Sequence, residues 1–148
     1  VQKLTELGVD VIVPFAAERS VVRWTTDQAA AHAQRWRRVA REAAMQSRRT
    51  WLPEVADVAT FTDTVARPGA ALAAAGGEAA PDPAVHRLVL VGPEGGWSDA
   101  EVDEAARRGC ARVRLGPHVL RAETAAMAAA ALLAAVRDGL LGRPPIPT

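Results

Sequence analysis

Two short apolar runs in the second half of the chain each lead into a glycine-containing turn and then into a helical pattern. Residues 87–91 precede the turn at 92–96, and the run at residues 111–115 leads into the turn at 115–121. Compact aliphatic runs are typical of strands buried on both faces of a parallel sheet. Alternating strands and helices predict an α/β domain with a mainly parallel sheet. Ligands of such sheets bind outside the carboxyl ends of the strands, so the two turns form a predicted ligand site.

Helix signals support this reading. Ser98 and Glu101 form a capping box, and Gly109 is a stop signal, so a helix is expected over residues 99–108. An alanine-rich helix follows from about Glu123. The rest of the chain predicts a helix end at 2–7 closed by Gly8, a strand at 9–14, a long helix at 26–48 capped by Thr26, a loop with a short strand at 51–59, a short helix at 61–65 and a loop at 78–85. Residues 69–75 are ambiguous, because their alanines favour a helix whereas the nearby glycines and Pro68 argue against a long one.

The glycines alone do not identify a ligand. Their spacing fits neither the dinucleotide fingerprint nor the P-loop, and a lone glycine-rich turn is more often a plain loop. Six motifs in one order are more specific. They are residues 3–9, Glu18-Arg19-Ser20, residues 38–43 with Gln46-Ser47, residues 52–55, residues 91–97, and Leu115-Gly116 with residues 120–125.

In this order the motifs resemble the RsmE family, which belongs to the SPOUT class of methyltransferases. The resemblance covers about residues 2–135. It implies methylation of N3 of a uridine in 16S ribosomal RNA of the small subunit, with S-adenosylmethionine as cofactor. It also implies a SPOUT α/β fold with helices on both faces of the sheet, a strand at residues 69–75, a deep trefoil knot formed by the carboxyl-terminal segment, and a homodimer. An internal core helix in a monomer is the alternative interpretation of residues 125–136, which are apolar nearly all round.

The resemblance also bears on domain organisation. Relatives of this type carry a PUA-like RNA-binding domain before the part that matches here. The helix end at residues 2–7 predicts that the chain begins inside a larger protein. Residues 1–148 are therefore interpreted as an isolated SPOUT methyltransferase domain.

The family implies that backbone groups of the two turns hold the cofactor. Glycines suit this role because a side chain would prevent close approach of the backbone. The predicted cofactor-binding residues are Leu90, Gly92, Gly95, Gly96, Leu115, Gly116, Leu120, Arg121 and Thr124.

Methylation at uridine N3 requires removal of a proton, or cationic donors that stabilise the uracil anion. Arg19 is the first candidate for contact with the target nucleotide, followed by Arg49 and Arg121. Glu94 or Glu123 is the candidate proton acceptor. The alternative for either glutamate is to organise a loop by accepting backbone N–H bonds.

A cationic surface is predicted on the long helix. Six arginines lie between residues 35 and 49, against one acid, Glu42. At 100° per residue Arg37, Arg41 and Arg48 share one stripe with Arg38 beside it, and these four are the predicted RNA-binding residues. A merely solvated face is the alternative. Few aromatic residues are present, so an aromatic RNA-binding sheet is not expected, and Trp24 and Trp97 are expected to pack.

Composition narrows the function classes. The 148 residues, 49% hydrophobic and 24% charged, suit one globular domain, and no membrane span or signal peptide is visible. The single cysteine, Cys110, fits a core thiol in the reducing cytoplasm. Three scattered histidines provide no metal-ligand spacing, and no metal is expected.

Two other functions remain open at this point. A SPOUT ribose 2′-O-methyltransferase usually carries Ser-Leu-Asn in the last loop, where this chain has residues 120–124, Leu-Arg-Ala-Glu-Thr. A non-catalytic RNA-binding module would use only the basic helix. Two intact glycine turns argue against that second function.

Overall fold

The computed structural model describes residues 1–142. Helices and strands alternate along the chain, as the sequence predicted. The elements are α1 (Gln2–Glu6), β1 (Val11–Ile12), β2 (Phe15–Ala16), α2 (Thr26–Gln46), β3 (Glu54–Val55), β4 (Ala59–Thr60), α3 (Phe61–Val65), β5 (Ala70–Ala73), β6 (Leu88–Leu90), α4 (Asp99–Arg107), β7 (Ala111–Val113) and α5 (Ala122–Arg137).

Every strand pair is parallel, which confirms a mixed α/β fold with parallel pairing. β1 pairs with β3, β2 pairs with β4, and the third sheet has the order β6-β5-β7. The strand predicted at 9–14 is instead two short strands with Pro14 between them. Pro14 has no N–H to donate to a neighbouring strand, so the strand is interrupted there. Only its carbonyl bonds to the adjacent strand, by accepting the N–H of Ala59 at 2.9 Å.

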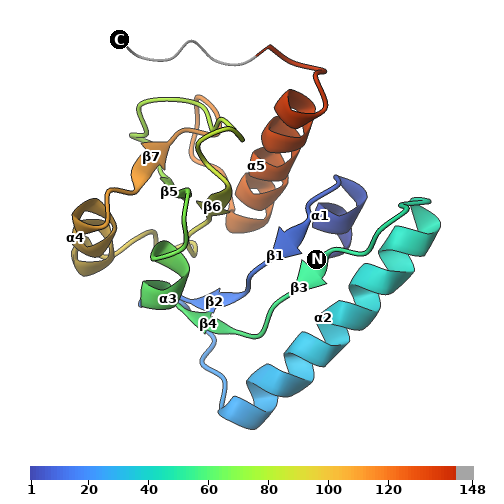
Figure 1. Cartoon of the computed structure of the whole chain (residues 1–148). Helices are drawn as coiled ribbons and strands as arrows, with labels where there is room; N and C mark the ends of the chain where they lie inside the picture. The colour runs from blue at the N-terminus through green and yellow to red at the C-terminus, as the bar shows by residue number, and fades with distance from the viewer. Residues whose placement is uncertain (143–148) are drawn as a thin grey trace.

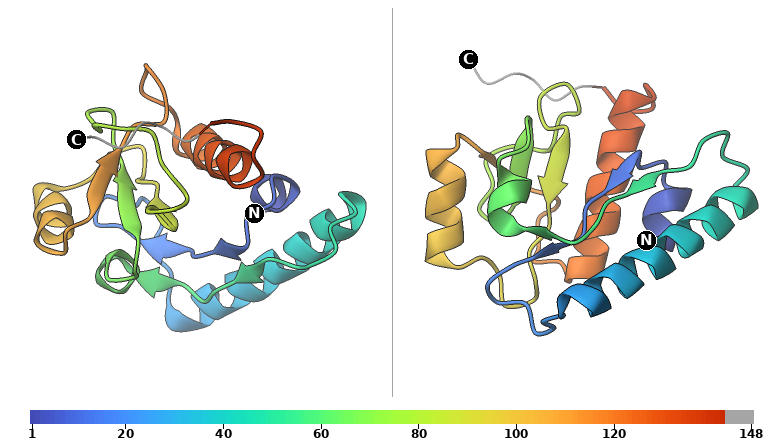
Figure 2. Two further views of the ribbon diagram at one scale, coloured as in Figure 1. Left: turned by 45° about the horizontal axis from the view of Figure 1, so that its top comes forward. Right: turned by 60° about the horizontal axis from the view of Figure 1, so that its bottom comes forward.

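Two apolar clusters hold the elements together. The larger one joins α3, α4 and the three-stranded sheet through Phe61, Val65, Leu72, Leu90 and Ala105. The smaller one packs α2 against β1 and β3. Figures 1 and 2 show α4 and α5 on opposite sides of the three-stranded sheet, with α2 lying along β1 and β3. The fold therefore places the ends of β5, β6 and β7 between helices.

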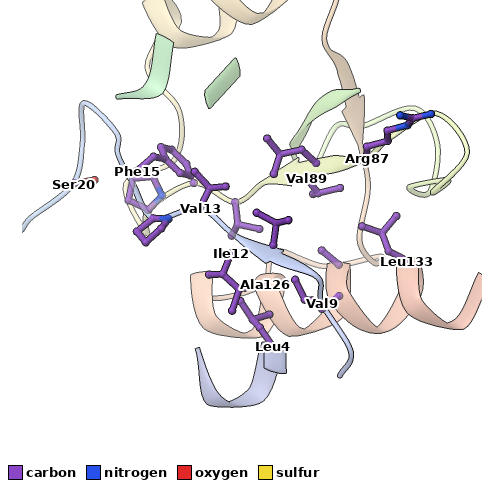
Figure 3. Close-up of a pocket in the computed structure, with 18 residues that line it drawn as sticks. Leu4, Val9, Ile12, Val13, Phe15, Ser20, Arg87, Val89, Ala126 and Leu133 are labelled. Atoms are coloured by element: carbon purple, nitrogen blue, oxygen red, sulfur yellow. The ribbon is translucent and has the colours of Figure 1, made fainter. Parts of the chain in front are cut away.

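An apolar cleft of about 320 Å³ separates β6 from β1 and α5. Val89 of β6 and Leu133 of α5 line it (Figure 3). Because of this cleft, Leu88 and Val89 are only half-buried. The sequence predicted a strand buried on both faces, and within β6 only Leu90 is buried. α5 buries Ala125, Ala129 and Ala130, and most of its other apolar side chains are half-buried. No helix among residues 1–142 has the length and apolar character to cross a bilayer.

The start of α2 differs from the prediction by one residue. Thr25, not Thr26, is the cap, because its hydroxyl accepts a bond from the N–H of Gln28 while the Gln28 side chain accepts from the N–H of Thr25. This capping box requires a Gln or Glu three residues after the threonine, and Ala29 occupies that place relative to Thr26.

The end of α2 also differs. The helix stops at Gln46, and Arg48 has a left-handed φ of 56°. The N–H groups of Arg48 and Arg49 return to the carbonyls of Met45 and Ala44, at 3.3 and 3.0 Å. This is a Schellman motif, in which glycine usually takes the left-handed place. Arg48 therefore does not continue the helical stripe of Arg37 and Arg41, and that prediction is wrong.

Arg48→Gly should be more stable than Arg48→Ala by about 1 kcal/mol. Both variants remove the same charge, but only glycine adopts the left-handed backbone without a steric cost. Urea unfolding of the two variants measures the difference. Equal stabilities would mean that the left-handed turn at residue 48 imposes no strain.

Candidate functional site

A cavity of about 270 Å³ lies at the carboxyl edge of the three-stranded sheet. β5 is the central strand and all three strands are parallel, so their carboxyl ends meet at this edge. The wall comes from residues that follow each strand: Ala74 after β5, Gly92 after β6 and Leu115 after β7, with Ala125 of α5 closing one side. β6 and β7 follow each other along the chain but lie on opposite sides of β5, so the strand order reverses here. Open α/β sheets bind ligands at such a point.

The cavity confirms that the two glycine turns lie together. Most of the predicted cofactor-binding residues reach its wall, and the candidate proton acceptor of the first turn lines it as well. These residues are Gly92, Gly96, Leu115, Gly116, Leu120 and Glu94.

Four predicted cofactor-binding residues lie outside the wall. Leu90 is 1% exposed and belongs to the core beneath the cavity. Gly95 faces Arg19 instead. Arg121 is the N-cap residue of α5, and Thr124 is exposed in the first turn of that helix. The helix begins at Ala122, one residue before the expected start at about Glu123, and both Arg121 and Thr124 are exposed.

The glycines serve different purposes. At Gly92 a Cβ atom would lie 3.0 Å from the Trp97 ring, so a larger residue would push against the indole. Trp97 is fixed in turn, because its Nε1 donates to the carbonyl of Ala73 at 2.9 Å and its ring stacks on Phe15. Gly96 has a left-handed φ of +69°, a conformation that favours glycine. At Gly116 a Cβ atom would have no other atom within 4 Å. Gly116 thus leaves open space at the cavity wall.

Arg19 lies against the first glycine turn. Its guanidinium donates to the carbonyl of Gly95 at 3.0 Å, and a Cβ at Gly95 would approach the Arg19 side chain to 3.2 Å. The structure thus brings the first catalytic candidate to the loop that also carries Glu94. The carboxylates of Glu94 and Glu123 accept no hydrogen bond within residues 1–142. The loop-organising alternative is therefore not supported for either.

The loop-organising carboxylates are Glu101 and Glu18. Glu101 is 6% exposed, and its carboxylate accepts the N–H groups of Ser98 at 3.0 Å and of Glu18 at 2.8 Å. The Ser98 hydroxyl donates to the Glu18 carboxylate. This network fixes the loop after β2 onto the start of α4, and so it holds Arg19 beside Gly95.

Glu101→Gln should lower the free energy of unfolding by roughly 1.5–3 kcal/mol. The amide keeps one accepting oxygen, but its NH₂ group replaces the other and faces a backbone N–H. Two donors then meet, and that N–H loses its bond to a buried charge. Urea denaturation checks this, with Glu104→Gln as the matched control. Glu104 is on the same helix and pairs with Arg107 and Arg108 on the surface, so its loss should cost much less. Equal losses would mean that the buried network contributes no more than a surface pair.

Some site residues were not predicted. Ala73, Ala74 and Ala75 line the cavity at the end of β5, and Arg114, His118 and Val119 line it after β7. Alanines carry no chemical signal, and only the sheet order β6-β5-β7 places them here. Arg114 and His118 border a predicted motif, so its polar flanks would have indicated them.

Arg49 lies in a different part of the molecule. Its side chain is 8% exposed, and it donates to the carbonyls of Thr5 and Val9 at 2.9 and 3.0 Å. The guanidinium also sits over the Trp51 ring. These contacts anchor the end of α1 and support an anchoring role in place of the predicted catalytic one.

The predicted RNA-binding arginines divide into two groups. Arg37 donates to the carbonyl of Val55 and pairs with Asp57 at 2.8 Å, so part of its guanidinium is already bonded within the protein. Arg38, Arg41 and Arg48 are exposed and have no ion-pair partner within residues 1–142. Trp36, Val39, Ala40 and Ala43 face the opposite, packed side, as expected.

Cys110 packs beside the larger core, as predicted for a core thiol. Its Sγ donates to the carbonyl of Val65, and burial raises the pKa of the thiol. Within residues 1–142, no group of three His, Cys, Asp or Glu side chains gathers at one point.

Comparisons with known proteins agree with the geometry. The family model described as an RNA methyltransferase domain matches residues 1–134. The chain is 35% identical over 141 residues to the ribosomal RNA small subunit methyltransferase E of Bacillus subtilis, covering 84% of this chain and 55% of that protein. It is 36% identical over 142 residues to the protein of the same name from Mycobacterium bovis, covering 87% and 54%. The chain thus spans about half the length of these relatives.

Solved structures show the same fold. A ribosomal RNA small subunit methyltransferase E from Neisseria gonorrhoeae, bound to S-adenosylmethionine, matches with a TM-score of 0.74 and 33% identity, over 88% of this chain and 57% of that one. A putative methyltransferase from Legionella pneumophila, with the cofactor bound, matches with a TM-score of 0.80 and 29% identity, over 91% and 59%.

Proposed function

Because the chain belongs to the RsmE family of RNA methyltransferases, we propose that it transfers the methyl group of S-adenosylmethionine to N3 of a uridine in 16S ribosomal RNA. The observation that carries this proposal is the cavity at the carboxyl edge of the sheet, which both glycine turns and Glu94 line, with Arg19 hydrogen-bonded to Gly95 of the first turn. A plain loop would need neither an open glycine wall nor a fixed cation beside it.

The residues of the cavity fit an adenosyl group. Val91, Leu115 and Leu120 offer an apolar slot, and Gly116 leaves open space where a side chain would stand. Arg114 and His118 at the rim are the groups that would meet the carboxylate of the methionine moiety. The apolar cleft beside β6 is larger, but apolar side chains dominate its wall, so it lacks partners for the ribose and the amino acid.

In the proposed reaction the cofactor supplies an electrophilic methyl group, and the protein orients the base and handles the N3 proton. Arg19 is held by Gly95 with part of its guanidinium free to contact the uracil or its phosphate. A cation there stabilises negative charge spread over the uracil oxygens. Glu94 has a free carboxylate at the cavity and accepts the proton.

We also propose the knot, the dimer and the fragment nature of the chain. β7 lies on the far side of β5 from β6, yet α5 returns to the β6 side and lines the cleft with Val89. This return supports the proposal that the connections after β6 and β7 cross, which ordinary chains avoid and a trefoil knot requires. Exposed Leu140 and Leu141 continue the apolar surface of α5 and suit a dimer contact. The chain spans about half the length of the relatives, which is the support for its being part of a longer protein.

Calorimetric titration with S-adenosylmethionine, together with the molar mass in solution, tests this function. We expect saturable binding of about one cofactor per subunit and the mass of a dimer. Methyl transfer to small ribosomal subunits, with mapping of the modified atom, then tests the N3 assignment. Methylation of a ribose oxygen would favour the 2′-O reaction, and a folded dimer that binds no cofactor would favour an RNA-binding module.

A further inference from the structure

A second hollow adjoins the cofactor cavity. It has a volume of about 590 Å³ and lies between the loop at residues 17–24 and the first glycine turn. Pro93 and Glu94 line both hollows, so one turn of backbone separates them. A molecule in this groove, which we call the loop groove, would lie within reach of a group held in the cavity.

An aromatic ring is available in the loop groove. Trp24 lines it and is 37% exposed. The ring makes a T-shaped contact with Trp36, with centroids 5.5 Å apart, and a tilted contact with His32 at 4.7 Å. A tryptophan that is held by aromatic neighbours and still lines an open groove is a platform on which a nucleobase stacks. The expectation that Trp24 simply packs is thus only half fulfilled.

The charges of the groove suit a nucleotide. Arg23 lines it and has no hydrogen bond or ion pair within residues 1–142. The carboxylate of Glu18 also lines the groove, and one of its oxygens accepts a bond from the Ser98 hydroxyl. Glu94 is the free acid, at the boundary with the cavity. The groove thus combines a cation for a phosphate, a ring for a base and one proton acceptor.

We propose that the loop groove holds the unpaired uridine nucleotide that is methylated, with its base stacked on Trp24, its phosphate near Arg23 and its N3 edge toward Glu94. The identity of this ligand rests on the proposed function. RNA bases are recognised most readily when they are unstacked from their neighbours and placed on an aromatic side chain. The arrangement gives each of the three groove residues a separate role.

The test is binding of a labelled single-stranded oligouridylate, measured by fluorescence anisotropy for the wild type and for Trp24→Ala, Trp24→Phe and Arg23→Gln. Trp24→Ala should weaken binding about 5- to 140-fold, the equivalent of about 1–3 kcal/mol of base stacking, and Trp24→Phe should restore most of it. Arg23→Gln touches no packing contact, and it should reduce the salt dependence of binding by about one phosphate contact.

Trp51→Ala is the matched control. Trp51 is also an exposed tryptophan, but it follows α2 whereas Trp24 precedes it, so the helix keeps them about 30 Å apart. This variant should bind RNA as the wild type does. Unchanged binding by both Trp24→Ala and Arg23→Gln would overturn the groove assignment, as would an equal loss in Trp51→Ala. The titrations need no cofactor, so failure to bind S-adenosylmethionine would refute the proposed function separately.

Discussion

Gly116→Val is expected to weaken S-adenosylmethionine binding by up to about 100-fold while leaving the fold intact. Gly116 lines the cavity, its φ is not in the left-handed region, and no atom lies within 4 Å of an added Cβ. Valine therefore fits the backbone and places its methyl groups in space that the ligand needs. A misfit of this kind costs up to about 3 kcal/mol, which corresponds to two factors of ten in affinity. Calorimetric titration measures the loss, and thermal unfolding checks the fold.

Gly142→Val is the matched control for this substitution. Gly142 also has open space around its Cβ, but it follows α5 and does not line the cavity. It should bind the cofactor normally. Gly96→Val is a poorer test, because Gly96 has φ of +69° and valine would strain the turn itself. Normal affinity in a folded Gly116→Val variant would move the cofactor out of this cavity.

Local signals predicted the second half of the fold well. The capping box at Ser98 and the stop at Gly109 fixed α4 to within one residue, because both depend on contacts between near neighbours. α2 was harder at both ends. Two adjacent threonines left its cap undecided until the partner Gln28 was considered, and an arginine in the left-handed place gave no sign that the helix had ended.

The candidate site was predicted as far as its glycines. Turns that follow parallel strands lie at one edge, so Gly92 and Gly116 were expected together. The bond from the Glu18 N–H to Glu101 spans 83 residues, and no short-range pattern predicts it. The sequence indicated only a helix cap at Glu101, whereas the fold uses the same carboxylate to position Arg19. The loop groove was missed for the same reason, because its walls come from distant segments.

Glu94→Gln is expected to lower kcat for methyl transfer about 10²- to 10⁴-fold at neutral pH with saturating cofactor. The substitution keeps the size of the side chain but removes its ability to take the N3 proton, and loss of a general base has this magnitude. Glu94 is exposed and makes no hydrogen bond within residues 1–142, so the fold should not respond. Single-turnover methylation of small ribosomal subunits measures the effect.

The pH profile separates a proton acceptor from a residue that only positions the substrate. As the pH rises, uracil ionises without help from the protein, so the deficit of Glu94→Gln should narrow. A positioning defect would remain constant across the same range. Glu123→Gln is the control, since Glu123 is exposed on α5 and lines neither the cavity nor the loop groove. If Glu123→Gln shows the larger, pH-dependent loss, the proton acceptor is on α5, and the base must approach the cavity from the side of that helix.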